Sequence, residues 1–376
     1  MPGHSGARRP AGALLAALLL LLAAPPHARA QELRDEAATG GEAERYLRLL
    51  QVTGRAPLYP WSIRGFSPAE VDRLVPADSV HPWAARLAPE AQGGARAALL
   101  RPQVGLTFHS AAPVEENDGA VWAGRGVTAA VSAGVAARAG PLSLRLEPLA
   151  FWAQNRDFEL MPLTQAGPTP FADPDRPGTI DRPQRFGDGS YARVDPGQST
   201  LRLDLRGVAV GVSTANQQWG PAVDLPLVMG TNAGGFPHLF VGTATPWKVG
   251  IGRVHGRVTW GSLEQSAFSA MQGHGSRRYG SGIVAAFLPW GVDGLEVGFS
   301  RFFHEAWPQG GLEFRDLLDP LQAFLKADLD ESGQGSDQHW SPDNQIASAF
   351  ARWVFPRGGV EVWGEYVRND HNWDLT

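Results

Sequence analysis

The sequence contains no cysteine, which excludes a disulfide framework and any metal site built from thiolates. The formal net charge is only −5 over 376 residues, so the chain lacks the strongly basic character of a nucleic-acid-binding protein. After the first thirty residues, no apolar run approaches the ~20 residues of a transmembrane helix. If the mature chain lies in a membrane, it must therefore cross it as a β-barrel.

The first thirty residues have the three parts of a secretory signal peptide. Arg8 and Arg9 form the positive region, residues 13–24 form the apolar region, and residues 28–30 read Ala-Arg-Ala, a cleavage site. The alternative is an uncleaved membrane anchor, but the apolar region is too short to span a bilayer. We expect residues 1–30 to be removed and the mature protein to reach the outer membrane.

Residues 31–100 are predicted to form a short helical segment that precedes the β region. Residues 42–52 have apolar positions at helical spacing. The segment from Ser67 to Glu70 is a capping box with proline at the first helical position. A third, alanine-rich helix is expected over residues 87–100. The segment is interpreted either as a small periplasmic cap or as a separate functional domain.

From Pro102 onward, apolar and polar residues alternate as they do in β-strands. The clearest run is residues 201–206, Leu-Arg-Leu-Asp-Leu-Arg. Alternation recurs at residues 104–108, 127–135, 142–146, 254–260, 295–299, 346–355 and 360–367. The polar face carries charges of both signs, which predicts a polar lumen. The predicted lumen-lining residues are Arg202, Asp204, Arg206, Arg253, His255 and Arg257.

This pattern favours a mainly β fold, an antiparallel transmembrane β-barrel, over a soluble β-sandwich. Several of the 13 tryptophans lie at strand ends, where a membrane-interface girdle would place them. Short connections alternate with long ones, as in outer-membrane barrels with short periplasmic turns and long outer loops. We therefore assign residues 31–100 to a helical periplasmic segment and residues 101–376 to a barrel with long extracellular loops.

The predicted number of strands is odd, about eleven. Single-chain bacterial barrels have even numbers of strands and close on themselves. We therefore expect an incomplete barrel that lacks C-terminal strands, with an unpaired edge on the run at residues 360–367.

Residues 217–242 form a long connection that is neither regular nor polar. Prolines and glycines interrupt it, yet it retains large apolar residues such as Trp219, Met229 and Phe236. Because a solvent loop would be more polar, we expect this one to fold back into the protein. Long loops of this kind are often functional.

Within this stretch, Trp219-Gly220-Pro221, Asp224, Thr231-Asn232-Ala233 and Pro237 resemble the signature region of the capsule assembly Wzi family. The resemblance extends over about residues 46–376 and is strongest from 219 to 266. It implies an outer-membrane β-barrel that holds capsular polysaccharide at the bacterial surface, with a helical N-terminal part on the periplasmic side. It also implies a longer chain with more strands.

A glycan-binding surface needs aromatic faces for sugar rings and planar polar groups for hydroxyls. On the predicted outer loops these groups are Trp219, Asp224, Asn232, Asp173, Arg176, Arg182, Trp307 and Trp340. Trp219 also has a structural interpretation, as the anchor of the inward-folded loop.

His238 and His255 lie near carboxylates, which raises the alternatives of a metal site and an acid–base pair. The sequence has no HExxH, GxSxG or Walker motif. We interpret the two histidines as hydrogen-bonded wall residues and expect no catalytic centre, metal or cofactor.

Three hypotheses for function stay open. The first is a non-enzymatic, lectin-like protein that retains capsular or exopolysaccharide, with outer-membrane lipid and the polysaccharide export machinery as further partners. The second is a general porin or solute channel, and the third is an outer-membrane enzyme acting on lipid or glycan. A porin should conduct in planar bilayers, whereas an anchor obstructed by its own loop should not.

Overall fold

The computed structural model describes residues 38–74, 95–114, 116–178, 180–269, 276–308, 310–314, 316–318, 320 and 344–369. Within these residues the chain is mainly β, as predicted, with two α-helices, α3 (Glu42–Val52) and α4 (Pro68–Leu74). No helix in the described residues is long and apolar enough to cross a membrane. The predicted signal peptide lies outside the described residues.

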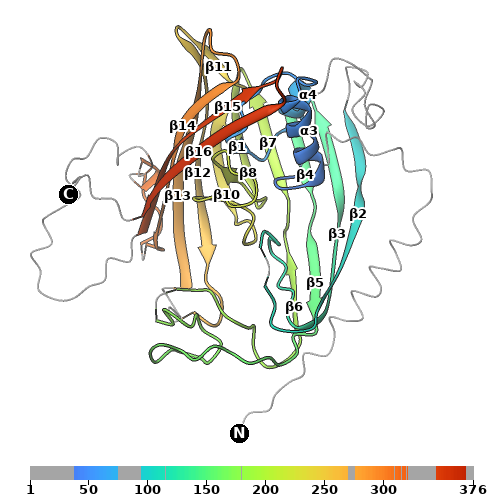
Figure 1. Cartoon of the computed structure of the whole chain (residues 1–376), viewed down its shortest axis with the longest axis vertical. Helices are drawn as coiled ribbons and strands as arrows, with labels where there is room; N and C mark the ends of the chain where they lie inside the picture. The colour runs from blue at the N-terminus through green and yellow to red at the C-terminus, as the bar shows by residue number, and fades with distance from the viewer. Residues whose placement is uncertain are drawn as a thin grey trace, which may run out of the picture.

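Fourteen strands form one large antiparallel sheet (Figure 1). They are β2 (Arg96–His109), β3 (Gly126–Ala139), β4 (Leu142–Leu146), β5 (Leu149–Ala153), β6 (Tyr191–Asp195), β7 (Thr200–Leu205), β8 (Val208–Ser213), β10 (His238–Thr243), β11 (Trp247–Val249), β12 (Gly252–Glu264), β13 (Arg277–Pro289), β14 (Leu295–Ala306), β15 (Asn344–Phe355) and β16 (Val360–Asn369). A separate ladder pairs β1 (Ile63–Arg64) with β9 (Gln218–Trp219).

The fourteen strands occupy eleven positions around the wall, because three positions are filled by interrupted strands. β4 and β5 both pair with β3, β7 and β6 continue along them, and β10 and β11 both pair with β12. The count agrees with the predicted strand number. β2 and β16 are the two edges, and their described residues do not pair with each other, so the wall is not closed.

The start of the β region differs from the prediction. A helix was expected over residues 87–100, but β2 already begins at Arg96, and residues 87–94 lie outside the described part. Pro102, predicted as the boundary, lies in a β-bulge between Leu100 and Gln103. Proline has no N–H for the ladder, so a bulge on an edge strand accommodates it.

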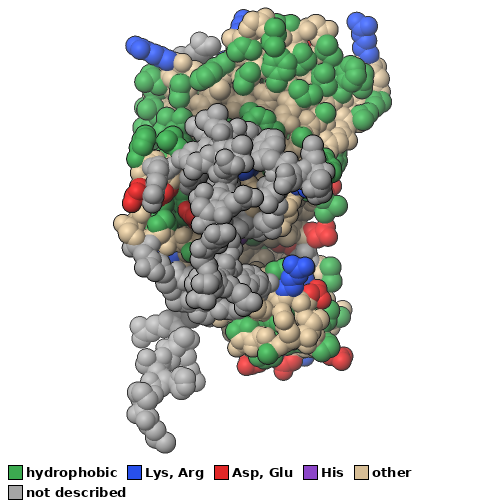
Figure 2. Space-filling view, turned by 90° about the vertical axis from the view of Figure 1, so that its left-hand side faces the viewer, with side chains coloured by type: hydrophobic (Ala, Val, Ile, Leu, Met, Phe, Trp, Pro, Cys, Tyr) green, Lys and Arg blue, Asp and Glu red, His purple; other side chains and the backbone are tan. Residues whose placement is uncertain are grey.

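The strands alternate between an apolar outer face and a polar inner face. In β7, Leu201, Leu203 and Leu205 are exposed on the outside, whereas Arg202 is buried inside. Figure 2 shows hydrophobic side chains over the upper part of one face, with acidic side chains at its lower end. This apolar outside with a polar inside is the pattern of a membrane barrel.

Short turns join the strands at one end of the wall, as predicted. They are residues 140–141, 206–207, 290–294 and 356–359. Arg206 and Gly207 have φ angles of 51° and 84°, which fits the tight two-residue turn that suits a twisted hairpin. Three half-exposed tryptophans lie near this end and donate their indole N–H to backbone carbonyls: Trp247 to Gly207, Trp290 to Val249 and Trp353 to Asp293. Indoles of this kind, apolar with one polar group, suit a membrane interface.

Residues 38–74, here called the N-terminal plug, pack inside the wall. Both predicted helices are confirmed, and α4 has the predicted capping box, with Ser67 N donating to Glu70 and Glu70 N donating to Ser67 Oγ. The plug has an apolar core that includes Leu47, Trp61 and Val71. Figure 1 shows α3 and α4 at the end with the short turns. The segment is therefore not a cap outside the barrel but a plug within it.

Buried polar contacts hold the plug to the wall on several sides. Glu296 of β14 accepts hydrogen bonds from the backbone N–H groups of Trp61 and Ser62, each at 2.9 Å. Arg48 of α3 donates to Glu361 of β16 at 2.8 and 3.1 Å. Because these partners are far apart in sequence, they fix the plug against both β14 and β16.

Residues 217–237, here called the central loop, also fold inward, as predicted. Trp219 of β9 is fully buried against Ile63, Phe302 and Phe350. Residues 238–243, at the end of the predicted irregular stretch, form strand β10 instead.

The remaining long connections lie at the opposite end from the short turns (Figure 1). The predicted loop at residues 155–198 contains two strands that were not expected there, β6 and the start of interrupted position β7, as well as an irregular part. Phe268 packs against Phe171 and Phe186, so this loop contacts the connection after β12. Of the helix predicted at residues 314–329, only a short 3-10 helix, η2 (Asp316–Leu318), lies in the described part.

Candidate functional site

The central loop lines an open groove of about 620 Å³ that contains two of the predicted glycan-binding residues, Asp224 and Asn232. Both side chains are exposed. Amides and backbone carbonyls alternate with apolar side chains such as Leu227 and Phe236 along the groove. The sequence prediction therefore placed two residues correctly in one accessible, mixed polar and apolar surface.

Contacts with neighbouring segments fix the shape of the groove. Asn117 donates through its side chain to the backbone carbonyl of Asp224 at 2.7 Å, and its backbone N–H donates to Asn232 Oδ1 at 3.3 Å. Thr231 donates to Asn117 Oδ1 at 3.1 Å. The Asp224 carboxylate lies 3.2 Å from Arg45 of α3. The plug, the central loop and the connection after β2 thus meet at this groove.

Trp219 does not contribute to this surface. Its side chain has no exposed area, and its indole N–H points to Gln217 Oε1 at 3.4 Å. The prediction of a glycan contact is wrong for this residue, because a ring buried between the plug and the wall cannot meet a sugar. The alternative interpretation, an anchor for the central loop, is correct.

The predicted cluster in the loop after β5 separates into a buried and an exposed part. Asp173 is fully buried and accepts hydrogen bonds from the backbone N–H groups of Asp175 and Arg176. It also accepts one from Arg182 at 2.8 Å. Asp173 is therefore a structural residue of its own loop, contrary to the prediction. Arg176 and Arg182 are exposed, as a binding role requires.

Trp307 lies on a different surface from the groove. Arg277 stacks over its ring at 3.6 Å, and Tyr279 packs against it edge-on. Together with Leu312 and Leu317 it borders an apolar depression on the outer side of the wall. Trp340 lies outside the described residues. Among the residues that the structure describes, no hydrogen bond or ion pair joins Trp307 to Asp224 or Asn232.

Four of the six predicted lumen-lining residues have inward, well-packed positions: Arg202, Asp204, His255 and Arg257. Arg253 follows the same face of β12 but lies near the short-turn end, 5.7 Å from the Trp290 ring. Arg206 is wrong, because the chain turns there and its side chain is exposed.

Glu70 is the buried carboxylate that connects the plug to these wall residues. Its Oε2 lies 3.2 Å from Arg202, and its Oε1 lies 3.3 Å from the His255 ring and accepts a hydrogen bond from Tyr59. Burial raises the pKa of Glu70, but Arg202 and His255 outweigh burial and hold this pKa well below its usual range. The sequence identified Glu70 only as a capping residue. Its long-range partners left no local signal.

Both histidines are hydrogen-bonded wall residues, as interpreted from the sequence. His238 Nδ1 lies 2.7 Å from the carbonyl of Phe236, and Gln217 lies 3.1 Å from its other nitrogen. His255 Nδ1 lies 2.6 Å from Thr243 Oγ1. In the described residues, no group of three or more histidine and acidic side chains is arranged to hold a metal ion.

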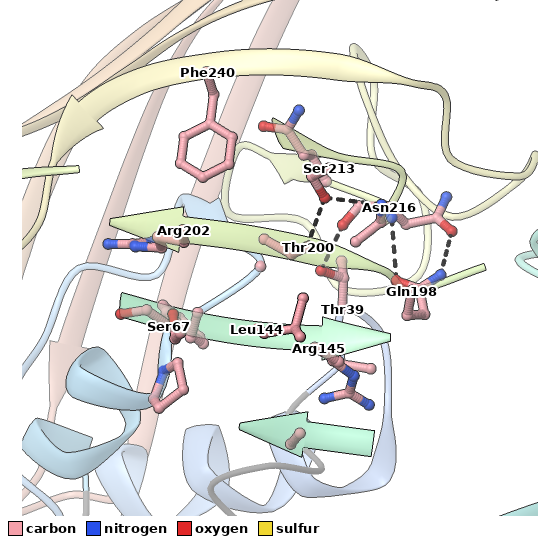
Figure 3. A pocket seen from close by; sticks show the side chains of 18 of the residues that line it. Thr39, Ser67, Leu144, Arg145, Gln198, Thr200, Arg202, Ser213, Asn216 and Phe240 are labelled. Carbon is pink, nitrogen blue, oxygen red and sulfur yellow. Dashed lines mark hydrogen bonds between the residues drawn. The ribbon is translucent and has the colours of Figure 1, made fainter. Parts of the chain in front are cut away.

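A second, smaller cavity of about 100 Å³ lies deeper in the lumen, between the plug and strands β3, β4, β7 and β8. Two predicted lumen residues, Arg202 and Arg257, line it. Figure 3 shows Arg202 and Phe240 at one end of this cavity and Gln198 and Asn216 at the other.

Comparison with known proteins relates the fold to solved structures. No family model and no curated protein matches the sequence. The chain superimposes on Wzi from Escherichia coli, described as an outer-membrane protein involved in group 1 capsule assembly and as a carbohydrate-binding β-barrel. The TM-score is 0.54 at 14% identity, over 90% of this chain and 64% of that one. The chain thus spans less than two thirds of the Wzi structure and shares its fold.

A second solved structure, OccK10 (OpdN) from Pseudomonas aeruginosa, gives a TM-score of 0.31 at 11% identity. That comparison covers 74% of this chain and 66% of the other. A score this low carries no argument about function.

Proposed function

We propose that this protein is a Wzi-like outer-membrane barrel that binds capsular or exopolysaccharide and retains it at the bacterial surface without enzymatic activity. The observation that carries the proposal is the pair of inward-folded segments. The N-terminal plug and the central loop pack against each other and the wall around fully buried Trp219. Such a lumen obstructs passage, while the groove beside it offers a surface to a polymer.

The apolar outer face supports the membrane location. Leucine and valine side chains are exposed on β7 and β8, and half-exposed tryptophans follow the short-turn end. Outer-membrane barrels carry short turns on the periplasmic side and long loops outside. On this orientation, the plug lies toward the periplasm, close to any polysaccharide export machinery, and Arg176 and Arg182 lie on the outer loops.

The groove has the chemistry that a polysaccharide needs. Asp224 and Asn232 provide planar acceptors and donors for hydroxyls, and the apolar side chains between them suit the faces of sugar rings. A polymer repeats each weak contact along its length, so retention depends more on avidity than on any single residue.

The alternative is a porin or solute channel, and the polar, arginine-rich lumen favours it. The two functions differ in what loss of the protein does to the cell. Deleting the gene should lower cell-bound polysaccharide and raise released polysaccharide, with solute uptake unchanged. If both polysaccharide fractions stay constant while uptake of small solutes falls, the retention proposal is wrong and the channel takes its place.

The groove is tested separately by the double substitution Asp224→Ala and Asn232→Ala. Both side chains are exposed, and the Asp224–Arg45 pair is a surface contact, so the fold should be little affected. We expect less cell-bound polysaccharide at equal protein level. Asp293→Ala, at an exposed position in the short turn before β14, is the matched control and should leave retention unchanged.

A further inference from the structure

The lumen cavity between the plug and β3, β4, β7 and β8 has an unusual charge distribution (Figure 3). Four arginines line it: Arg138, Arg145, Arg202 and Arg257. No aspartate or glutamate belongs to the lining. The carboxylates that pair with Arg145 and Arg202, such as Glu147 and Glu70, lie behind the guanidinium groups rather than at the cavity surface. The cavity is therefore positive where a ligand would touch it.

Two of these arginines have hydrogen-bonding capacity left over. Arg202 donates to Glu70 and Asp204 through two of its nitrogens, but its Nη2 is buried and meets no protein acceptor among the described residues. Arg257 is buried as well, and in the described part of the chain no carboxylate lies within ion-pair distance of it. Its contacts are long ones, 3.3 to 3.5 Å, to Gln217 Oε1 and to the carbonyls of Arg64 and Gly65.

A buried guanidinium without a carboxylate is costly, because burial removes its hydration and neutral carbonyls replace it only in part. An anion in the cavity would supply the missing partner through charge-assisted hydrogen bonds. The electrostatics thus select a ligand that carries a negative charge.

The rest of the cavity suits a sugar. The Phe240 ring lies between the two arginines, 5.9 Å from the Arg202 guanidinium and 5.2 Å from that of Arg257. At the other end, Gln198 and Asn216 are held by a 2.8 Å side-chain hydrogen bond. Their amides and the nearby hydroxyl of Thr200 can exchange hydrogen bonds with sugar hydroxyls, and the aromatic ring can cover an apolar face.

The size of the cavity limits the ligand. A water needs about 10–15 Å³ of such volume, so 100 Å³ holds roughly seven to ten waters. That is about the room taken by one small ring with its substituents. A polymer strand would not fit, whereas a single residue would.

We propose that this cavity binds one carboxylate-bearing sugar residue, with Arg257 and Arg202 holding the carboxylate. The sugar part of this assignment rests on the proposed polysaccharide function, whereas the anionic part stands on the cavity alone. The site would give the lumen a preference for acidic over neutral sugars.

The test uses purified protein in detergent and measures the rise in melting temperature with added glucuronate, glucose or acetate, since a ligand of the folded state stabilises it. We expect glucuronate to raise the melting temperature, with glucose and acetate much weaker at equal concentration. Equal effects of acetate and glucuronate would overturn the sugar assignment, and no effect of glucuronate would overturn the site.

Arg257→Gln should weaken glucuronate binding by about tenfold to a hundredfold, because it removes a charge-assisted contact. The variant should fold, since only long hydrogen bonds to neutral groups are lost. Arg253→Gln, on the same face of β12 but outside the cavity lining, is the matched control and should bind as before. Unchanged binding by Arg257→Gln would contradict the proposal. These results do not depend on cell-bound polysaccharide, so failure here and failure of the retention function are distinguishable.

Discussion

The carboxylate of Glu70, in α4, lies 3.2 Å from the guanidinium of Arg202, in β7, and both side chains are buried. The two residues are 132 positions apart, so this contact forms only when the plug is inside the wall. It joins a segment that would otherwise be a short helical leader to the middle of the barrel. The stability of the plug therefore depends on a small number of buried ionic contacts.

Replacing Glu70 with glutamine should destabilise the protein strongly. Breaking a buried pair by removing one partner costs about 3–5 kcal/mol, because the other charge stays buried. Asp204 remains 2.8 Å from Arg202, so we expect a value near the lower end. Thermal unfolding in detergent measures the effect. Glu42→Gln, at an exposed carboxylate of α3, is the control and should change the stability by less than about 0.5 kcal/mol.

The same carboxylate should make the plug sensitive to acid. The pKa of folded Glu70 lies below the ordinary value of 4.5, so Glu70 contributes stability that is complete above that value. The contribution is lost as the pH falls below 4.5 and through the lower folded pKa. Melting temperatures measured from pH 7 downward should fall for the wild type, and the Glu70→Gln variant should lose less over the same range. Parallel curves would contradict this assignment.

Trp219→Ala should destabilise the packing between the central loop, the plug and the wall. Removing a fully buried tryptophan leaves a cavity and costs about 3–5 kcal/mol. Trp353→Ala removes a half-exposed ring from the outer face and should cost less. Hydrogen exchange across residues 217–237 checks the result, and it should increase for the first variant only.

Asp173→Ala should loosen the loop after β5 rather than act on glycan binding directly. The carboxylate accepts two backbone N–H groups and Arg182, and leaving such donors without a partner costs about 1–3 kcal/mol. Limited proteolysis should cut the variant within residues 155–190 faster than the wild type. Asp175→Ala, at an exposed neighbour, should be cut at the wild-type rate.

The barrel strands could be predicted from the sequence because each buries one face and exposes the other, and this leaves a period of two in the chain. Residues 201–206 show this clearly, and β7 follows the predicted alternation until Arg206, where the turn begins. The interrupted strands β5 and β6 are short, and the prolines and glycines around them hide the period.

The partners of the plug could not be predicted, because they depend on contacts between distant segments. Nothing near Glu296 indicates that it accepts the backbone N–H groups of Trp61 and Ser62. Within the candidate site, Asp224 and Asn232 were found because their loop looked unusual, whereas buried Asp173 was misassigned because composition carries no information on burial.

The plug also makes a prediction about conductance that separates the two functions. Glu70 and Glu296 hold it to β7 and β14 through buried contacts. Local opening is an equilibrium, and each 1.4 kcal/mol of lost stability raises the open population about tenfold. In planar bilayers we therefore expect little steady current from the wild type and frequent transient openings from a double variant, Glu70→Gln with Glu296→Gln. Glu42→Gln should behave as the wild type does. A wild type that conducts steadily, with no change in the double variant, would mean that the plug does not obstruct the lumen, and the channel function would then be the better explanation of the polar interior.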